Sequence, residues 1–209
     1  DALDALPQGA RVATSSARRV LFLQALRPDL TAIPVRGNVD TRLRKLAAGE
    51  CDALLLAAAG LIRLGCWSPE TPARLTTAGG AFHVVPLRAD AGFLPAPGQG
   101  ALAVQMREDD PRRATVAAAL DDAPTRAATL AERACLAALG GGCRVPIGAL
   151  ATIVDATRVE LTAAVAQARP LRCLRHSIAG RIEEAEALGR QLAEALLHGG
   201  ARAILAAAS

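Results

Sequence analysis

The residue best suited to chemistry in this sequence is Cys143, because of the residues on either side of it. Gly140, Gly141 and Gly142 precede the cysteine and leave its sulfur without side-chain cover, and Arg144 follows it. A neighbouring cation favours the thiolate, which is the nucleophilic form of the side chain. The segment therefore predicts a nucleophilic thiol. The alternative is a cysteine packed in a buried loop beside the apolar residues that follow.

The other four cysteines do not form a recognisable site. Cys51, Cys66, Cys135 and Cys173 lie in or beside apolar segments, and we assign them no role. They show no CxxC pair and no metal-ligand spacing with the histidines, so neither a disulfide framework nor a metal site is predicted. No histidine stands near Cys143 in the sequence in a way that indicates a cysteine hydrolase.

Arginines recur where three predicted strands lead into helices. Ligands of an open parallel sheet bind beyond the carboxyl ends of its strands, where helix N-termini offer free N–H groups to anions. Arginine recognises carboxylate and phosphate groups with two parallel hydrogen bonds. We therefore expect a cleft for a ligand with several carboxylates or phosphates. The residues at the three junctions are Thr14, Ser15, Ser16, Arg18 and Arg19; Arg36, Gly37, Asn38 and Arg42; and Gly60 and Arg63.

Composition supplies a competing explanation for these arginines. Of the 24 basic residues all but Lys45 are arginine, which is also what a base-composition bias would produce, and exposed helix arginines are usually solvated. The net charge is +4, but aromatic residues make up only 2% of the chain, which leaves few stacking platforms and argues against nucleic-acid binding.

The elements that would position these residues follow a βαβαβ pattern over residues 10–64. Strands are predicted at 11–14, 32–35 and 53–57. Ser16 is the expected N-cap of a helix over 17–27, a second helix runs from Asn38 to Gly49, and a third begins near Ala59. Residues 65–95 are irregular and give no firm prediction.

A connector and a second unit follow. Two prolines and two glycines surround Gln99, which is expected either to act as a hinge or to aim its amide into the cleft. Residues 101–106 resemble a strand. Helical spacing then runs from Ala127 to Ala138, three strands are predicted near 147–153, 158–166 and 171–179, and a helix spans 183–198. We predict domains at 1–94, 95–120 and 121–209, the last a small α+β domain.

The ends and the hydropathy of the chain suggest a soluble, cytoplasmic protein. No run of about 18 apolar residues is present, and the segment Asp1 to Pro7 lacks the basic start and apolar stretch of a signal peptide. We therefore expect no membrane contact.

Five segments resemble the porphobilinogen deaminase (hydroxymethylbilane synthase) family, in the family's order and over nearly the whole chain. Residues 14–19 are similar to its TSSxRR segment, 36–42 to RGNVxTR, 59–64 to AGLxRL, 98–100 to the GQG crossover, and 141–148 to the GGCxxPIG cofactor loop. The resemblance implies an α/β fold: one lobe of the type II periplasmic-binding-protein kind and a C-terminal α+β domain with a three-stranded antiparallel sheet and helices.

The resemblance also implies an activity and a site. Members of the family are transferases that condense four porphobilinogen molecules, with loss of ammonia, into hydroxymethylbilane for porphyrin and haem biosynthesis. They use a covalent dipyrromethane cofactor, which here would be attached through a thioether to Cys143. The matching residues for cofactor binding are Ser16, Arg18, Arg19, Arg36, Arg42 and Gly60, and those for substrate binding are Arg63 and Gln99.

One family segment has no match. The family's HSxKD segment, whose aspartate serves catalysis, belongs to an N-terminal lobe that precedes the matched region, so no catalytic residue is identified here. Three interpretations stay open: an enzyme, one half of a split enzyme that pairs with a separate N-terminal lobe, or an inactive remnant that keeps only an anion-binding module. A monomer is expected unless such pairing occurs.

Overall fold

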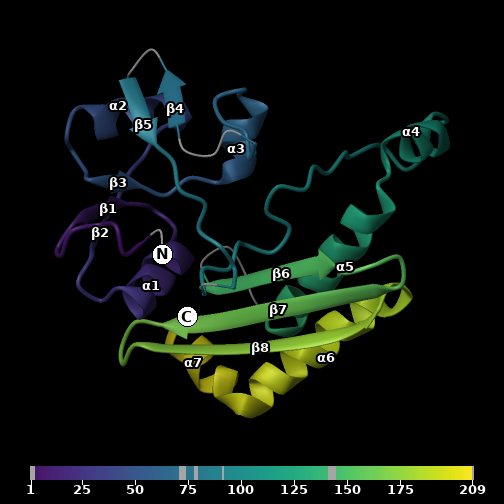
Figure 1. Ribbon diagram of the computed structural model, residues 1–209. Coiled ribbons are helices and arrows are strands. Elements are labelled where there is room, and N and C mark those ends of the chain that lie inside the picture. The colour runs from purple at the N-terminus through teal and green to yellow at the C-terminus, as the bar shows by residue number, and fades with distance from the viewer. Residues whose placement is uncertain (1–2, 71–73, 78–79, 91, 141–144, 209) are drawn as a thin grey trace.

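The computed structural model describes residues 3–70, 74–77, 80–90, 92–140 and 145–208. Within them the chain forms an N-terminal α/β lobe, an extended connector and a C-terminal α+β domain (Figure 1). The fold class predicted from the sequence is confirmed: one three-stranded sheet is parallel, and the other is antiparallel and flanked by helices. No helix among the described residues is long and apolar enough to span a membrane.

The N-terminal lobe has the predicted βαβαβ order. The strands β1 (Arg11–Ala13), β2 (Thr31–Ile33) and β3 (Ala53–Leu54) pair in the order β2-β1-β3, all parallel. The helices are α1 (Ala17–Leu26), α2 (Val39–Ala47) and α3 (Ala58–Arg63). β2 begins and ends slightly earlier than predicted, and β3 is shorter, because its chain leaves the sheet after Leu54.

Two side-chain caps, of which Ser16 was predicted, explain where the first helices begin. Ser16 Oγ accepts a hydrogen bond from the Arg19 N–H at 3.4 Å, and Asn38 Oδ1 accepts one from the Thr41 N–H at 2.9 Å. Each cap satisfies an N–H group that the helix itself leaves unpaired. Three residues separate helix α1 from β1 and five separate α2 from β2, and both helices follow the carboxyl ends of their strands.

A hairpin occupies part of residues 65–95, for which no firm structure was predicted. Strands β4 (Arg74–Thr77) and β5 (Gly80–His83) pair antiparallel. Leu75 is buried with Leu43, Leu61 and Trp67, so the hairpin shares a small core with α2 and α3.

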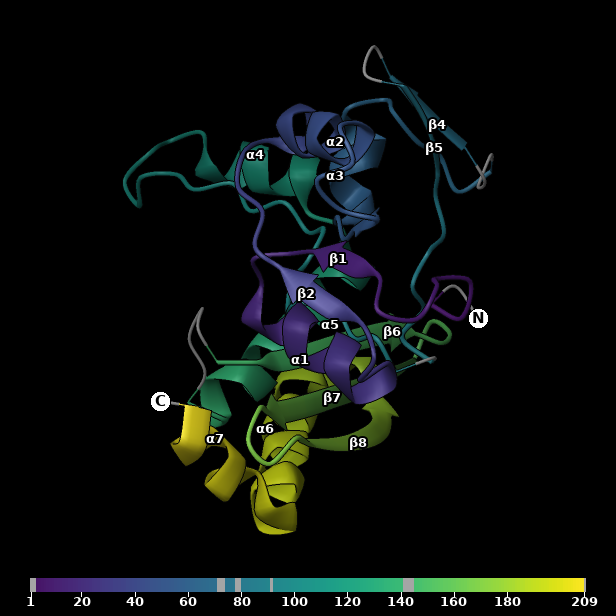
Figure 2. The same ribbon diagram turned by 90° about the vertical axis from the view of Figure 1, so that its left-hand side faces the viewer.

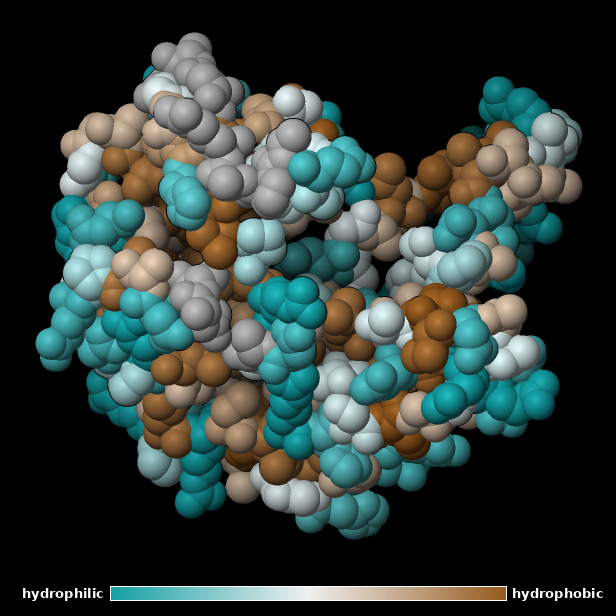
Figure 3. Space-filling view, viewed as in Figure 1, coloured by the Kyte–Doolittle hydropathy of each residue, from teal (hydrophilic) through white to brown (hydrophobic). Residues whose placement is uncertain are grey.

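The connector differs from its prediction. No strand forms over 101–106, and Leu102 and Val104 are 78% and 63% exposed. The reason is that a strand needs a hydrogen-bonded neighbour, and no described strand runs beside this segment. The connector ends in α4 (Arg113–Leu120), which was not predicted and which stands apart from the N-terminal lobe in Figure 1. The face shown in Figure 3 is hollowed between that lobe and the α4 arm.

Most helices and strands after residue 120 lie close to where they were predicted. Helix α5 (Ala123–Ala138) leads to strands β6 (Ile147–Ile153), β7 (Arg158–Gln167) and β8 (Arg172–Arg181), which pair antiparallel in that order. A 3-10 turn, η1 (Ile182–Glu184), opens α6 (Ala185–Leu196). A π-helical turn, η2 (Leu197–Ala201), then leads into α7 (Arg202–Ala208), which the sequence did not predict.

Helices α5 and α6 pack closely on one face of this sheet. Leu188, Leu192 and Leu196 of α6 are buried, whereas Leu130 of α5 is 42% exposed. A side chain at Gly189 of α6 would place its Cβ 2.2 Å from the backbone oxygen of Ala131 on α5. The backbones of α5 and α6 are therefore in direct contact at Gly189.

Helix α1 covers part of the other face of the same sheet (Figure 2). Alternate residues of a strand point to opposite faces. Accordingly, Ala163 and Val165 of β7 belong to the core with α5 and α6, while Ala164 and Ala166 pack with Phe22 of α1. A Cβ at Gly148 of β6 would lie 2.7 Å from Phe22 Cε2, so only glycine fits where the two parts of the molecule meet.

Candidate functional site

Arg18 is a buried cation at the carboxyl edge of the parallel sheet. It lies in the first turn of α1 and is only 7% exposed. Its Nη1 donates to the Leu94 carbonyl, its Nη2 lies 3.5 Å from Gln99 Oε1, and its guanidinium carbon lies 5.9 Å from the centre of the Phe22 ring. Burial, and then the charge of Arg19, lower the pKa of Arg18 to about 10. The group therefore remains positively charged at neutral pH.

Two further arginines extend this positive charge: Arg19 acts on Arg18, and Arg42 acts on Arg19. Arg19 Nη1 donates to the Leu55 carbonyl at 2.9 Å, and its pKa is lowered first by burial and then by the charge of Arg42. Arg42 Nε donates to the Gly37 carbonyl at 2.8 Å. Arg18 and Arg19 line the cavity described below, and Arg42 lies next to Arg19. We refer to these three residues as the arginine cluster.

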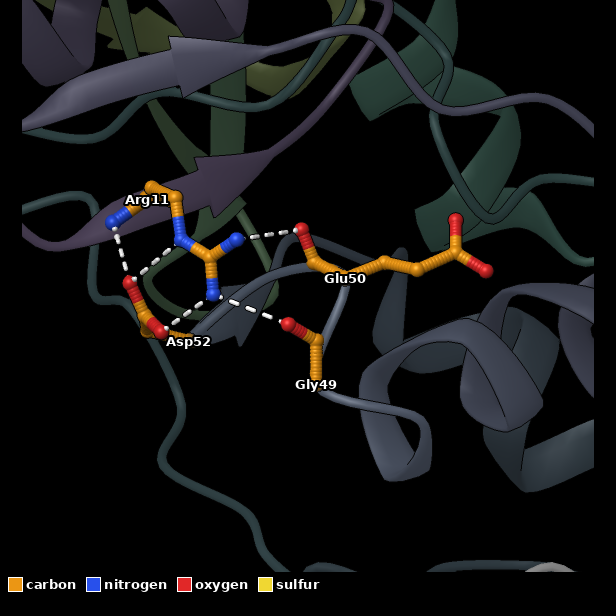
Figure 4. A network of polar contacts seen from close by, with 4 residues as sticks. All are labelled: Arg11, Gly49, Glu50 and Asp52. Atoms are coloured by element: carbon orange, nitrogen blue, oxygen red, sulfur yellow. Dashed lines mark hydrogen bonds and ion pairs between the residues drawn. The ribbon is translucent and has the colours of Figure 1, made fainter.

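The arginine cluster has no carboxylate partner among the described residues. Arg11, at the opposite edge of the same sheet, shows the contrast. Its side chain makes a two-point contact with the Asp52 carboxylate and also donates to the carbonyls of Gly49 and Glu50 (Figure 4). Buried cations without an anion are costly for a protein to keep. The arrangement thus favours an anionic ligand at the carboxyl edge.

A cavity of about 330 Å³ lies beside Arg18 and Arg19. Gln99 supplies its amide to the wall, and most of the remaining lining is apolar. A ligand that fits the cavity would have an apolar body and anionic groups. The apolar lining includes Leu43, Leu54, Leu56, Leu61, Trp67, Leu75, Phe82, Val84 and Phe93.

The turn at Gly98–Gly100 brings three of the predicted residues together. Gly98 and Gly100 have φ values of +71° and +95°. Residues with a side chain adopt such φ values only with backbone strain. Gln99 thereby faces Arg18, and Arg63 Nη2 donates to the Gly100 carbonyl. Of the two alternatives for Gln99, its place in the cavity wall agrees with an amide aimed into the cleft.

The remaining predicted residues are placed less centrally. Ser16 acts as the cap of α1, Arg36 and Arg63 are exposed, and Gly60 lies in α3 with no atom within 4 Å of where its Cβ would be. Cys143 and Arg144 lie outside the described residues. Among the described residues, no cluster of three or more His, Cys, Asp or Glu could hold a metal.

Sequence reasoning missed what Ser15 does. Its hydroxyl donates to the Val35 carbonyl at 2.6 Å and accepts from the Val35 N–H at 2.9 Å. These two bonds tie the first strand-to-helix junction to the second and so fix Arg18 and Arg19 relative to Arg42. The only signal in the sequence was that Ser15 belongs to the same Thr14–Ser16 run.

Two family models match this chain. Residues 1–115 match a family described as "Porphobilinogen deaminase, dipyromethane cofactor binding domain", and residues 127–198 match "Porphobilinogen deaminase, C-terminal domain". The first match contains the whole arginine cluster and the Gly98–Gly100 turn.

Curated relatives named porphobilinogen deaminase are similar along nearly the whole chain. One from Desulforudis audaxviator is 48% identical over 98% of this chain and 61% of its own length, and one from a Roseiflexus species is 47% identical over 98% and 62%. One from Acidothermus cellulolyticus is 46% identical over 97% of this chain and 58% of its own length. The chain thus spans about three fifths of the relatives it matches. By both family matches and these identities, the chain belongs to the porphobilinogen deaminase family.

Proposed function

We propose that this chain provides the anion-binding lobe and the cofactor-bearing domain of a hydroxymethylbilane synthase, which condenses four porphobilinogen molecules into hydroxymethylbilane. The observation that carries the proposal is the arginine cluster. The guanidinium groups of Arg18 and Arg19 are desolvated beside an apolar cavity, and none of the three arginines has a carboxylate partner among the described residues. A pyrrole chain that bears acetate and propionate arms has the matching chemistry.

The residues present fit a dipyrromethane group. Its carboxylates would pair with Arg18 and Arg19, its apolar rings suit the cavity wall, and Cys143 would supply the thioether sulfur. When bound, this group serves as the primer to which porphobilinogen units are added. Ser16, Arg36, Arg42 and Gly60 complete the proposed cofactor contacts, and Arg63 and Gln99 those to substrate.

The work of these residues is to bind and orient. Arginine remains charged across the physiological pH range, so Arg18 and Arg19 neutralise carboxylates without taking part in proton transfer. Gln99 offers an amide that can donate to or accept from a bound group. The Gly98–Gly100 turn and Ser15 hold these side chains in place before a ligand arrives, which lowers the cost of ordering them on binding.

The catalytic aspartate of the family is proposed to come from the family's first lobe, whose HSxKD segment has no match in this sequence. The exposed apolar residues Leu102 and Val104 offer that lobe a segment on which to dock. We therefore expect little or no turnover by the 209-residue polypeptide alone. Restored turnover on addition of a relative's first lobe, which carries the HSxKD segment, would support the split-enzyme arrangement.

Intact mass spectrometry tests cofactor attachment. The chain, purified from cells that make porphobilinogen, is expected to carry an adduct of two pyrrole units. Cys143→Ser should eliminate the adduct, while Cys173→Ser, which alters an exposed cysteine, should keep it. An unmodified wild-type chain would count against the assignment.

Ligand binding separates the enzyme part from the inactive remnant. A remnant that is only an anion-binding module would bind inorganic phosphate as well as porphobilinogen and would not gain activity from an added lobe. The proposed function requires preference for porphobilinogen, measured by calorimetry at equal ionic strength. Equal affinity for the two anions would favour the remnant.

A further inference from the structure

Glu132 is a buried carboxylate outside the arginine cluster. It lies on α5 and is only 6% exposed. Its Oε1 accepts a hydrogen bond from the Ala151 N–H at 2.8 Å, and its Oε2 accepts one from the Gly98 N–H at 2.5 Å. Burial raises the pKa of Glu132, and the two N–H donors act in the opposite direction. No described cation pairs with this carboxylate, so its partners are backbone amides.

The two amides belong to different parts of the molecule. Ala151 lies in β6, in the C-terminal domain, whereas Gly98 opens the turn that carries Gln99. A second link lies nearby, because the Ala149 N–H donates to the Pro95 carbonyl at 3.0 Å. Residues 95–98 are therefore attached to the C-terminal domain at both ends.

The same connector also contacts arginines of the α/β lobe. Arg18 donates to the Leu94 carbonyl and lies beside Gln99, and Arg63 donates to the Gly100 carbonyl. A shift of the turn would therefore move the acceptors that orient Arg18 and Arg63. Glu132 is the side chain that joins this turn to α5 and β6.

Only a carboxylate of this length meets both amides well. A glutamine side chain has one acceptor oxygen, and its NH₂ group would face the second N–H donor. Aspartate lacks one methylene and cannot reach as far. A buried N–H group that loses its acceptor is destabilised, so the turn would move toward solvent or another acceptor.

The position of α5, which carries Glu132, is also fixed by its contact with α6. The backbone oxygen of Ala131, the preceding residue, touches Gly189 of α6. Helix α5 is thus held by α6 on one side and by the two amides on the other. The same helix ends at Ala138, and the chain continues from it to Cys143.

We propose that Glu132 is a positioning residue, whose carboxylate sets the Gly98–Gly100 turn so that Gln99 and the arginines meet a carboxylate ligand. This inference rests on the proposed function for the identity of the ligand, but not for the contact itself.

The first test needs no ligand. Amide hydrogen exchange is measured by NMR on the wild type, Glu132→Gln and the matched control Glu160→Gln, which changes an exposed glutamate on β7. We expect at least about tenfold faster exchange at Gly98 and Ala151 in Glu132→Gln only, while Leu161 in the centre of β7 keeps its protection. Unchanged exchange at Gly98 in that variant would overturn the proposal.

The second test uses porphobilinogen as the probe. Its Kd, from calorimetry, is expected to rise about tenfold in Glu132→Gln and to stay unchanged in Glu160→Gln. Gln99→Ala should also weaken binding, and in the double variant the two effects should be less than additive, since both residues act through one turn. Full additivity, or a Kd equal to wild type in a folded Glu132→Gln, would refute a positioning role.

A third measurement uses the unaltered chain, in case Glu132→Gln does not fold. Porphobilinogen should slow exchange at Ala151, which lies in β6 and is joined to the turn through Glu132. A ligand that protects Gln99 but leaves Ala151 unchanged would overturn the coupling. If the wild type binds no porphobilinogen, the proposed function fails, and the ligand-free exchange comparison still decides the role of Glu132.

Discussion

Replacing Gly189 by alanine is expected to destabilise the chain, although alanine is the better helix former. The new Cβ would lie 2.2 Å from Ala131 O, 2.8 Å from Ala134 Cβ and 2.9 Å from Cys135 N. Two of these three atoms are backbone and cannot rotate away. Helix α6 would have to withdraw by roughly 1 Å, which also weakens the dispersion contacts of its neighbours.

The magnitude follows from two opposing effects. Overfilling a packed core costs about 1–3 kcal/mol, and backbone obstacles place this site at about 3. Alanine recovers about 1 kcal/mol of helix propensity. The net loss is about 2 kcal/mol, which corresponds to a fall in Tm of about 4–8 °C for a chain of this size.

Gly60→Ala is the matched control. Gly60 is also helical, in α3, but no atom lies within 4 Å of its added Cβ, so only the gain from reduced freedom of the unfolded chain applies. A gain of about 0.4–1 kcal/mol is expected. Thermal unfolding followed by circular dichroism should therefore give shifts of opposite sign. A Gly189→Ala variant as stable as wild type would refute the backbone contact between α5 and α6.

Three further results are expected. Phe22→Ala should lower the free energy of unfolding in urea by about 3–5 kcal/mol, because the ring is 1% exposed and fills the space between α1 and β6; a loss below about 1 kcal/mol would contradict that packing. The pKa of Asp52 is lowered to about 2, chiefly by its hydrogen bonds with Arg11, so Asp52→Asn should lower the urea midpoint of unfolding at pH 7. The difference from wild type should fade as the pH falls from about 4 through 2, and a difference that persists unchanged at pH 2 would exclude this linkage. Burial raises the pKa of Cys135 to about 12, so a disulfide reagent at pH 8 should modify it only after unfolding, whereas Cys173 should react in the native chain; rapid native modification of Cys135 would show that the α5 core opens.

The N-terminal lobe could be predicted because its signals are local. Ser16 and Asn38 are good caps, and each is followed by a helix that buries apolar side chains. The strand predicted at 101–106 was wrong for the opposite reason. Its alternation of Leu102 and Val104 is typical of a strand, but strand formation depends on a neighbour that the sequence of the segment does not contain.

The types of residue in the site could be predicted from the sequence, but their burial and their contacts could not. Arginine at the strand-to-helix junctions indicated an anion cleft, yet nothing in the sequence distinguished Arg18, which is buried, from Arg36, which is exposed. Glu132 was overlooked because a glutamate in a helix is usually solvated. Its only signal is that it shares a face with Ala128 and Cys135, and its two acceptors matter only once β6 and the connector lie beside it.

The uncompensated charge around Arg18 and Arg19 has a practical consequence for anyone who handles this polypeptide. If the cleft binds anions as we propose, citrate or phosphate from a buffer is expected to compete there with the carboxylates of the proposed ligand. Apparent affinities will then depend on the choice of buffer salt, and the chain will melt at a higher temperature in polyvalent anions than in chloride of equal ionic strength.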